Sequence, residues 1–491
     1  MVPNLLFFSN FGTIIMILKM GKEIIGRSLE KQKLTEILSS HRSELVAVYG
    51  RRRIGKTYLI REFFNDKIIF SFIGLSAENK SNQIKNFVLK LSEFTDKLKN
   101  EPLPKDWLEA FSLLKKYLKT IKESKKKKVI FIDEFPWIDS QKSGFLSAFE
   151  NFWNDYCSTR SDLIVVICGS AASYMVKKII RNVKGLSKRI TQTIKLMPFT
   201  LQETNEFLRY KGIKMEEYEL LKLYMSIGGI AEYLEHVHAG ESAVATIDRL
   251  CFQKGAYLEN EYDEVFKSLF EEQSYHQKIM NVLASSKKEG ITRNELINAL
   301  KISSGGKFSD SLDDLMQSGF ILKYDAFKNN KKAELYRIYD EFCLFHLKFI
   351  QKHKGSSWNS LFQQQSYISW CGFVFETICL KHIHPIKKAL KCDQMASENY
   401  HWHNANAQID LVIDRIDGVI TLCEIKFYNE EFSIDENMLK QLRKKENEFR
   451  KASQTKKSIY TCLISTFGIK PNQYSNAILS NSITIKDLFV A

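Results

Sequence analysis

Apolar positions over residues 30–196 alternate between short continuous runs and stripes with helical spacing. Continuous runs are typical of strands buried on both faces of a parallel sheet, and the stripes between them are typical of amphipathic helices. The alternation therefore predicts an α/β domain built on a parallel sheet. The strands are expected at 45–49, 68–72, 128–132, 163–168 and 190–196, and the helices at 30–38, 58–64, 81–122 and 145–156.

The first of these strands leads directly into the motif G-x-x-x-x-G-K-T, and helical spacing follows. Strand, glycine-rich loop and helix form the context that a phosphate-binding loop requires. Backbone N–H groups and the helix N-terminus would surround phosphate oxygens, the lysine would reach the β- and γ-phosphates, and the threonine hydroxyl would bind Mg²⁺. A glycine turn before a basic helix is the competing interpretation. The predicted ATP site consists of Gly50, Arg51, Arg52, Arg53, Ile54, Gly55, Lys56 and Thr57.

A pair of acids, Asp133 and Glu134, ends the apolar run at 128–132. Open α/β sheets bind ligands at the carboxyl ends of their strands, where these acids are expected to lie. Asp133 is predicted to hold Mg²⁺, directly or through water, and Glu134 to orient or deprotonate the attacking water. Without a phosphate loop upstream, a core strand with an acidic turn would explain the pair better.

Two polar residues further along are candidates for contacts with the γ-phosphate. Ser170 follows the strand at 163–168 and would sense that phosphate or position water. Arg189 precedes the strand at 190–196 and is a candidate arginine finger acting across the interface of a homo-oligomer. A surface arginine without a catalytic role explains Arg189 equally well. Helical spacing over 201–236, broken at Gly228-Gly229, predicts a small helical lid over the nucleotide.

Taken together, these motifs resemble the archaeal-type (DEXX-box) P-loop ATPases, which are relatives of the AAA+ and STAND NTPases. The resemblance covers residues 24–350 and implies ATP binding and hydrolysis; an endonuclease-like tail is common in that family. The chain departs from the family pattern at Ala231, where proline is usual, and at Ala171, where serine is frequent. The second departure weakens the assignment of Ser170. The motifs that carry the resemblance are Ile25-Gly26-Arg27, Gly50–Thr57, Ile132–Trp137, Gly169-Ser170, Arg189, Met197-Pro198-Phe199 and Gly228-Gly229-Ile230.

Three helical stripes and a hairpin follow, and this order predicts a winged helix-turn-helix. The third helix would enter the DNA major groove, and lysines of the hairpin turn would contact phosphates. The third helix nevertheless carries three aspartates, which repel DNA, so a winged helix used for protein contacts is an equal alternative. The helices are expected at 275–284, 293–300 and 308–317, the aspartates are Asp310, Asp313 and Asp314, and the lysines are Lys328, Lys331 and Lys332.

The tail of the chain carries a different pattern. Two apolar strands, 409–413 and 421–426, are joined through Asp417-Gly418 and predict a hairpin. The acids and the lysine within these strands match D-x(n)-E-x-K, and alternation places the last two on one face of their strand. Several charges inside apolar runs are costly to bury unpaired, which favours a metal site.

Asp410 and Glu424 are expected to bind Mg²⁺, with Glu376 of a preceding helix completing the metal shell. Lys426 would steady the nucleophile or the phosphate. This arrangement resembles the PD-(D/E)XK restriction-endonuclease fold, in the form found at the C-terminus of the same ATPase family. Because the pattern is short and common, charges exposed on a strand are the alternative explanation.

Composition limits the partners. The 491 residues are enough for several domains, and the net charge of +15 favours nucleic acid, DNA above all. Nine scattered cysteines without a C-x-x-C pair indicate free thiols and a cytoplasmic protein. The apolar segment 1–20 is interrupted by polar residues, so we expect neither a signal peptide nor a membrane helix.

The sequence thus predicts an α/β multidomain protein: a P-loop NTPase sheet with a helical lid, a winged helix-turn-helix and a restriction-endonuclease-like domain. Its nucleotide state would control DNA binding or Mg²⁺-dependent cleavage. The alternative is a nucleotide-dependent switch with an inactive nuclease fold that acts through protein partners. The expected parts are an extension (1–20), the ATPase core (21–198), the lid (199–260), the winged helix (261–352) and the nuclease-like domain (353–491).

Overall fold

The computed structural model describes residues 23–96, 101–182, 185–270, 272–286, 290–302, 305–325, 327 and 334–490. The expectations for residues 1–20 and for Lys328, Lys331 and Lys332 lie outside the described residues. The chain divides into two compact units, and each is described by itself. The first unit comprises Met1–Val48, Gly55–Gly169 and Ile179–Ile194, and the second comprises Tyr49–Ile54, Ser170–Lys178 and Lys195–Ala491.

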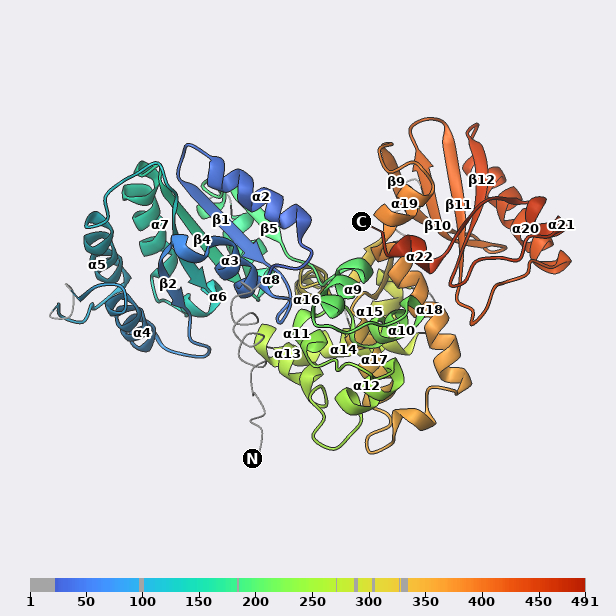
Figure 1. Cartoon of the computed structure of the whole chain (residues 1–491), viewed down its shortest axis with the longest axis horizontal. Helices are drawn as coiled ribbons and strands as arrows, with labels where there is room; N and C mark the ends of the chain where they lie inside the picture. Colours follow the sequence, from blue (N-terminus) through green and yellow to red (C-terminus); the bar gives the residue numbers. More distant parts are fainter. Residues whose placement is uncertain are drawn as a thin grey trace, which may run out of the picture. The chain divides into compact units, whose positions relative to one another are not determined.

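A five-stranded sheet with the order β2-β3-β4-β1-β5 organises the first unit (Figure 1). β2 runs parallel to β3, and β3 runs parallel to β4. The strands at its centre are buried along almost their whole length, as their continuous apolar runs predict, so the parallel sheet is confirmed. The strands are β1 (Glu44–Tyr49), β2 (Ile68–Ile73), β3 (Lys128–Asp133), β4 (Leu163–Gly169) and β5 (Gln192–Lys195).

The helices of this unit follow the predicted order with one correction. The single helical stretch expected at 81–122 is wrong, because the structure has two helices there, α4 (Lys80–Ser92) and α5 (Trp107–Lys119). Asp106 starts the second helix by accepting a hydrogen bond from the Glu109 N–H at 2.9 Å. Prolines 102 and 104 precede it, and proline lacks the N–H that a continuous helix needs. The other helices are α2 (Ser28–Ser39), α3 (Lys56–Phe64), α6 (Phe135–Ile138) and α7 (Phe145–Asp155).

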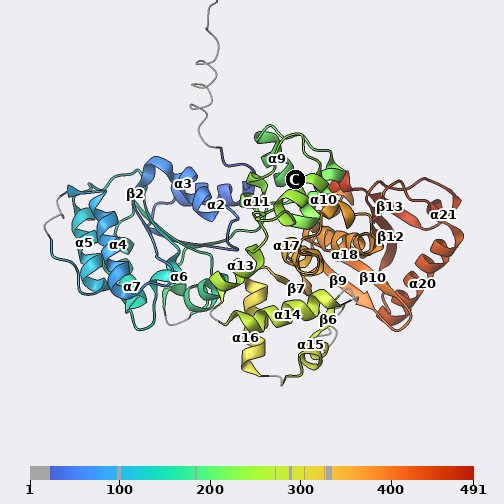
Figure 2. The same ribbon diagram turned by 90° about the horizontal axis from the view of Figure 1, so that it is seen from below.

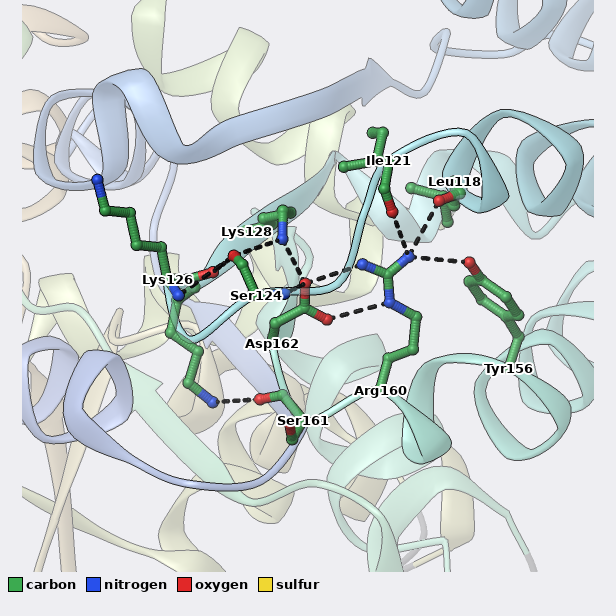
Figure 3. Close-up of polar contacts among 10 residues, drawn as sticks. Leu118, Ile121, Ser124, Lys126, Lys128, Tyr156, Arg160, Ser161 and Asp162 are labelled. Carbon is green, nitrogen blue, oxygen red and sulfur yellow. Dashed lines mark hydrogen bonds and ion pairs between the residues drawn. The ribbon is translucent and has the colours of Figure 1, made fainter.

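A buried ionic cluster lies at the amino ends of β3 and β4 (Figure 3). The Asp162 carboxylate is fully buried and accepts hydrogen bonds from Arg160 Nε at 3.0 Å and Nη2 at 2.8 Å, while Lys128 forms an ion pair with it. Arg160 also donates to the Leu118 carbonyl and to the Tyr156 hydroxyl, each at 3.0 Å. Burial raises the pKa of Asp162, but the hydrogen bonds from Arg160 and Lys128 outweigh it, so the pKa lies below its usual range.

We expect Asp162→Asn to destabilise the protein by about 3 kcal/mol, because it leaves two buried cations without their counter-charge. The folded-state pKa is lowered, so this stabilisation is present above the pKa of the unfolded carboxyl and disappears as the pH falls through the folded-state value. Urea unfolding at pH 7 measures the change. Asp66→Asn is the control, because Asp66 is 81% exposed and pairs with the adjacent Lys67; equal losses in both variants would contradict a structural role for the cluster.

The second unit begins with helices and continues into a small antiparallel sheet of order β6-β8-β7. Figure 2 shows α14, α15 and α16 grouped around this sheet. The helices are α8 (Ala172–Tyr174), α9 (Leu201–Tyr210), α10 (Glu217–Ile227), α11 (Ala231–Glu235), α12 (Ala243–Cys251), α13 (Glu261–Leu269), α14 (Gln273–Ser285), α15 (Arg293–Leu300) and α16 (Gly306–Gln317), and the strands are β6 (Ile291–Thr292), β7 (Ile321–Tyr324) and β8 (Leu335–Ile338).

The tail forms a mixed sheet with the order β13-β12-β11-β10-β9. The hairpin predicted from the sequence is confirmed: β10 and β11 are antiparallel, with Leu411 opposite Cys423, and Gly418 in their turn has a φ of 84°. β12 runs parallel to both of its neighbours. The elements are α17 (Glu341–Phe345), α18 (Gln365–Lys381), α19 (Ile383–Ala389), β9 (Ser397–His403), β10 (Gln408–Arg415), β11 (Val419–Lys426), α20 (Glu436–Ser453), β12 (Ser458–Ser465), α21 (Gln473–Asn476), β13 (Leu479–Ile483) and α22 (Ile485–Leu488).

The structure also describes the cysteines and the length and character of the helices. All nine cysteines are buried free thiols. Across the described ranges, no helix has both the length and the apolar character needed to cross a membrane.

Candidate nucleotide and carboxylate sites

The glycines of the phosphate loop occupy positions that other residues would strain. Gly50 has a φ of 154°, and a Cβ atom built on it would lie 2.2 Å from the Leu196 carbonyl oxygen. Gly55 has a φ of 90° and immediately precedes α3, whose first residue is the buried Lys56. Both glycines are therefore required by the backbone path.

Thr57 and Asp133 are brought together at the carboxyl end of β3. The Thr57 hydroxyl donates a hydrogen bond of 2.7 Å to Asp133 Oδ2, and the other carboxylate oxygen accepts the Glu134 N–H at 2.9 Å. A hydroxyl and a carboxylate are oxygen donors of the kind that Mg²⁺ prefers, so this pair fits the predicted ion. In the neighbouring strand β4, burial and the charge of Asp133 raise the pKa of the Cys168 thiol, which stays protonated.

Glu134 has a left-handed backbone conformation, with φ 44° and ψ 46°, at the start of α6. This region is uncommon for residues other than glycine and is often found at functional sites. No sequence motif points to Gly74, whose N–H donates to the Asp133 carbonyl at 3.0 Å. A Cβ atom at Gly74 would lie 2.7 Å from the Glu134 carbonyl oxygen, so the turn that presents Glu134 needs a glycine there.

The two residues proposed to contact the γ-phosphate have different surroundings. Arg189 is 31% exposed and lies 2.8 Å from Glu150 Oε1, and it donates to Asn154 Oδ1 at 2.6 Å. An arginine finger would have to leave these contacts with α7. Ser170 is buried directly after β4. Both assignments stay predictions.

Two of the three loop arginines, Arg51 and Arg53, belong to the second unit and pair with acids of that same unit. Arg51, 4% exposed, forms an ion pair with Asp340, which is also 4% exposed. Arg53 lies 2.6 Å from Glu261 Oε2 of α13 and 3.5 Å from Glu232 Oε1 of α11. Burial lowers the pKa of Arg53, but these two carboxylates outweigh it and raise the pKa. Sequence patterns missed the acids, because no periodic signal connects them to the loop.

From Asp340, buried ion pairs continue to the tail. Asp340 Oδ1 caps α17 by accepting the Cys343 N–H at 2.8 Å. The next residue, Glu341, pairs at 2.6 Å with Lys381 in the last turn of α18, and both side chains are nearly inaccessible. Gly228, with a φ of 68°, packs here, because a Cβ atom on it would lie 3.0 Å from Glu341 Oε2. An arginine of the phosphate loop is thus linked through α17 to α18, the helix that carries Glu376.

The tail carboxylates have partners. Glu424 Oε1 lies 2.7 Å from Lys426 Nζ, and Glu424 Oε2 lies 2.5 Å from Lys445 Nζ of α20. Asp410 Oδ2 accepts the Ile425 N–H at 2.8 Å, and Glu376 Oε2 lies 3.5 Å from Arg337 Nη1. No sequence pattern predicted Lys445 or Arg337, because they lie in α20 and β8, outside the hairpin and the helix that carry the acids.

The pKa of Lys426 depends on the three acids around it. Burial lowers its pKa, but the charges of Glu424, Asp410 and Glu376 outweigh burial and raise it, so all three acids act on one ammonium group. Even so, no set of three His, Cys, Asp or Glu side chains in the described residues is close enough to hold a metal ion. Cations and a backbone N–H compensate the three carboxylates in this structure, and the metal shell stays a prediction.

The acidic third helix, α16, faces the chain's own residues. Asp314 lies 2.6 Å from Lys177 Nζ and 3.4 Å from His276 Nε2, and it accepts a hydrogen bond from Ser173. Burial raises the pKa of Asp314, but these hydrogen bonds lower it to about 2. Phe327, beside the hairpin turn, stacks edge-on against Phe449 at 5.0 Å. These contacts are made with other parts of the same chain, and the partner of this module stays a prediction.

A family model matches the N-terminal part of the chain. Residues 25–237 match a family model described as an ATPase domain predominantly from Archaea. The uncharacterized protein MJECL04 of Methanocaldococcus jannaschii is 26% identical over 398 residues, which cover 79% of this chain and 83% of that protein.

Similar solved structures include the Walker-type ATPase PABY2304 of Pyrococcus abyssi, with a TM-score of 0.46 and 18% identity over 66% of this chain and 96% of that chain. The ORC2 protein of Aeropyrum pernix has a TM-score of 0.42 and 15% identity over 67% of this chain and 94% of that chain. Residues 25–237 are thus similar to ATPase domains found predominantly in Archaea, and their order of strand, glycine-rich loop and helix agrees with that similarity.

Proposed function

We propose that the protein hydrolyses ATP bound at Gly50–Thr57, with Mg²⁺ held by Thr57 and Asp133. The 2.7 Å contact between these two side chains supports this assignment. Bound Mg²⁺ would neutralise charge on the β- and γ-phosphates. Lys56 would bind those phosphates, and Glu134, presented by its left-handed turn, would orient and deprotonate the attacking water. Ser170 and Arg189 would contact the γ-phosphate, Arg189 from a second copy of the chain.

The nucleotide state would control the tail. The observation that supports this step is the series of buried ion pairs from Arg51 through Asp340 and Glu341 to Lys381. Because Arg51 belongs to the phosphate loop, arrival or loss of a γ-phosphate would change the charge near that loop. The pairing of Arg51 with Asp340 then strengthens or weakens, and α17 passes the change to α18. Buried pairs suit this use, because little solvent screens them.

The tail would act on DNA as a Mg²⁺-dependent nuclease of the PD-(D/E)XK type. Asp410 and Glu424 would bind the ion, with Glu376 joining them, and the ion would stabilise charge on the phosphate. Lys426 would bind the attacked phosphate or its nucleophile. In this structure Lys445 neutralises Glu424 and Arg337 neutralises Glu376. This arrangement would be the inactive state of the site, before a metal ion binds. The module at 261–352 would be a winged helix that holds the other parts together through α16 and its hairpin.

A second function is favoured by the same cation contacts: a nucleotide-dependent switch whose tail binds protein partners and does not cut. The ammonium groups of Lys426 and Lys445 could take the place of a metal ion permanently. Asp314 of α16 likewise pairs with Lys177 of the same chain. The two functions differ in whether DNA is cleaved and agree on nucleotide binding.

The coupling step is tested by removing both charges of one buried pair. We expect Glu341→Gln combined with Lys381→Met to keep the fold, because replacing a whole buried pair is often neutral. DNA cleavage by this variant should become the same in ATP and in ADP, whereas the wild type should distinguish them about tenfold, the usual size of such coupling. Plasmid nicking in Mg²⁺ with each nucleotide measures this. The matched control is the surface pair variant Lys115→Gln with Asp155→Asn; a double variant that still distinguishes ATP from ADP would remove these pairs from the pathway.

A further inference from the structure

Helix α20 presents three exposed basic side chains on one face. Lys440, Arg443 and Lys444 are spaced i, i+3 and i+4, which places them together on a helix surface. Lys440 is 67% exposed, and its one ion pair, with Glu436, is itself 61% exposed and worth little in water. In the part of the chain that is described, Arg443 and Lys444 form no ion pair. We call these three residues the basic face of α20.

The opposite face of α20 fixes the helix to the tail sheet. Leu439, Leu442 and Phe449 are buried. Leu442 belongs to one apolar cluster with Leu463 of β12, and Phe449 belongs to another with Leu422 of β11. Figure 1 shows α20 alongside β12. The basic face is therefore held in a defined orientation by packing.

Lys445, the next residue along α20, connects the basic face to the carboxylate site. Its side chain is 24% exposed, and its Nζ lies 2.5 Å from Oε2 of Glu424. Glu424 is one of the two acids proposed to bind Mg²⁺. One helix thus supplies a cation to the candidate cleavage site and further cations to the surface beside it. Helix α16 carries acids in place of such a surface. Asp314 contacts Lys177, Ser173 and His276, and Asp310 and Asp313 each lie 3.8 Å from Lys177 Nζ.

We infer that the basic face of α20 binds the sugar-phosphate backbone of DNA and leads the strand to Glu424 and Lys426. This inference rests on the proposed function for its substrate, and it names α20, not the winged helix, as the DNA contact. Lysine and arginine side chains that touch phosphates release counterions, so such binding depends steeply on salt. The net charge of +15 supplies the long-range attraction.

The test compares the triple variant Lys440→Gln, Arg443→Gln and Lys444→Gln with the wild-type full chain. Binding to a fluorescein-labelled DNA duplex is followed by fluorescence anisotropy between 50 and 200 mM KCl, with EDTA present so that no cleavage occurs. Loss of three phosphate contacts should reduce the slope of log K against log [salt] by about 2.7. Over this fourfold range of salt, the wild-type affinity should fall about 40-fold more than that of the variant.

The matched control removes the same charge elsewhere, through Lys122→Gln, Lys125→Gln and Lys126→Gln on the exposed loop before β3. It should bind DNA like the wild type, and circular dichroism should show that both variants are folded. Equal slopes in the α20 variant and the control would overturn the inference, as would the absence of DNA binding by the wild type. A wild type that binds through α20 but never cuts in Mg²⁺ would support the inference while the proposed cleavage fails.

Discussion

Glu134→Gln should lower the rate of ATP hydrolysis by about 10²- to 10⁴-fold, the range that general-base catalysis contributes, with little change in ATP binding. The amide keeps the size of the side chain but cannot accept a proton from water. ATP binding should persist, because the phosphate loop, Lys56 and the Thr57–Asp133 pair are untouched. Phosphate release and binding of a fluorescent ATP analogue measure the two quantities separately.

Glu123→Gln is the matched control for this variant, because Glu123 is exposed in the loop before β3 and has no assigned role. It should hydrolyse ATP at the wild-type rate. Hydrolysis by Glu134→Gln at that same rate would show that another residue activates the water. Loss of ATP binding together with hydrolysis would instead point to damage of the strained turn at Glu134 and Gly74.

The second large effect is expected at the tail. Glu424→Ala should reduce Mg²⁺-dependent DNA cleavage by about 10³-fold, as several kcal/mol of metal-based charge stabilisation are lost, while ATP hydrolysis continues. Glu424 contacts both Lys426 and Lys445, so its removal would delete a proposed metal ligand and release two cations at once. Plasmid and linear DNA, with Mg²⁺ or Mn²⁺ and with or without ATP, are the substrates and conditions.

Glu430→Ala controls for the loss of a carboxylate near the site, because Glu430 lies exposed in the loop after β11. Cleavage that is unchanged in Glu424→Ala would refute the nuclease site. A wild type that hydrolyses ATP but cuts under no condition would favour the switch, in which Lys426 and Lys445 hold the acids permanently. The search would then turn to protein partners of α16 and the tail.

Local patterns of apolar residues and turn residues predicted much of the fold. The apolar runs ending in Gly50–Thr57 and in Asp133 predicted strands that the structure contains, because a strand buried on both faces needs a continuous apolar sequence. The β10–β11 hairpin followed in the same way from alternation and its Asp417-Gly418 turn. The break between α4 and α5 was missed, since the apolar spacing continues on both sides of the prolines.

Candidate residues within one motif were also readable, whereas their partners were not. From the sequence alone, Lys56 and Thr57 could be placed at the start of one helix and Glu424 and Lys426 on one face of a strand, because backbone geometry sets the spacing of residues within one motif. The pairs Arg51–Asp340, Glu341–Lys381 and Lys445–Glu424 became visible in the folded chain and in no sequence pattern. Such pairs join residues 21 to 289 positions apart, and only packing of distant elements brings their charges into contact.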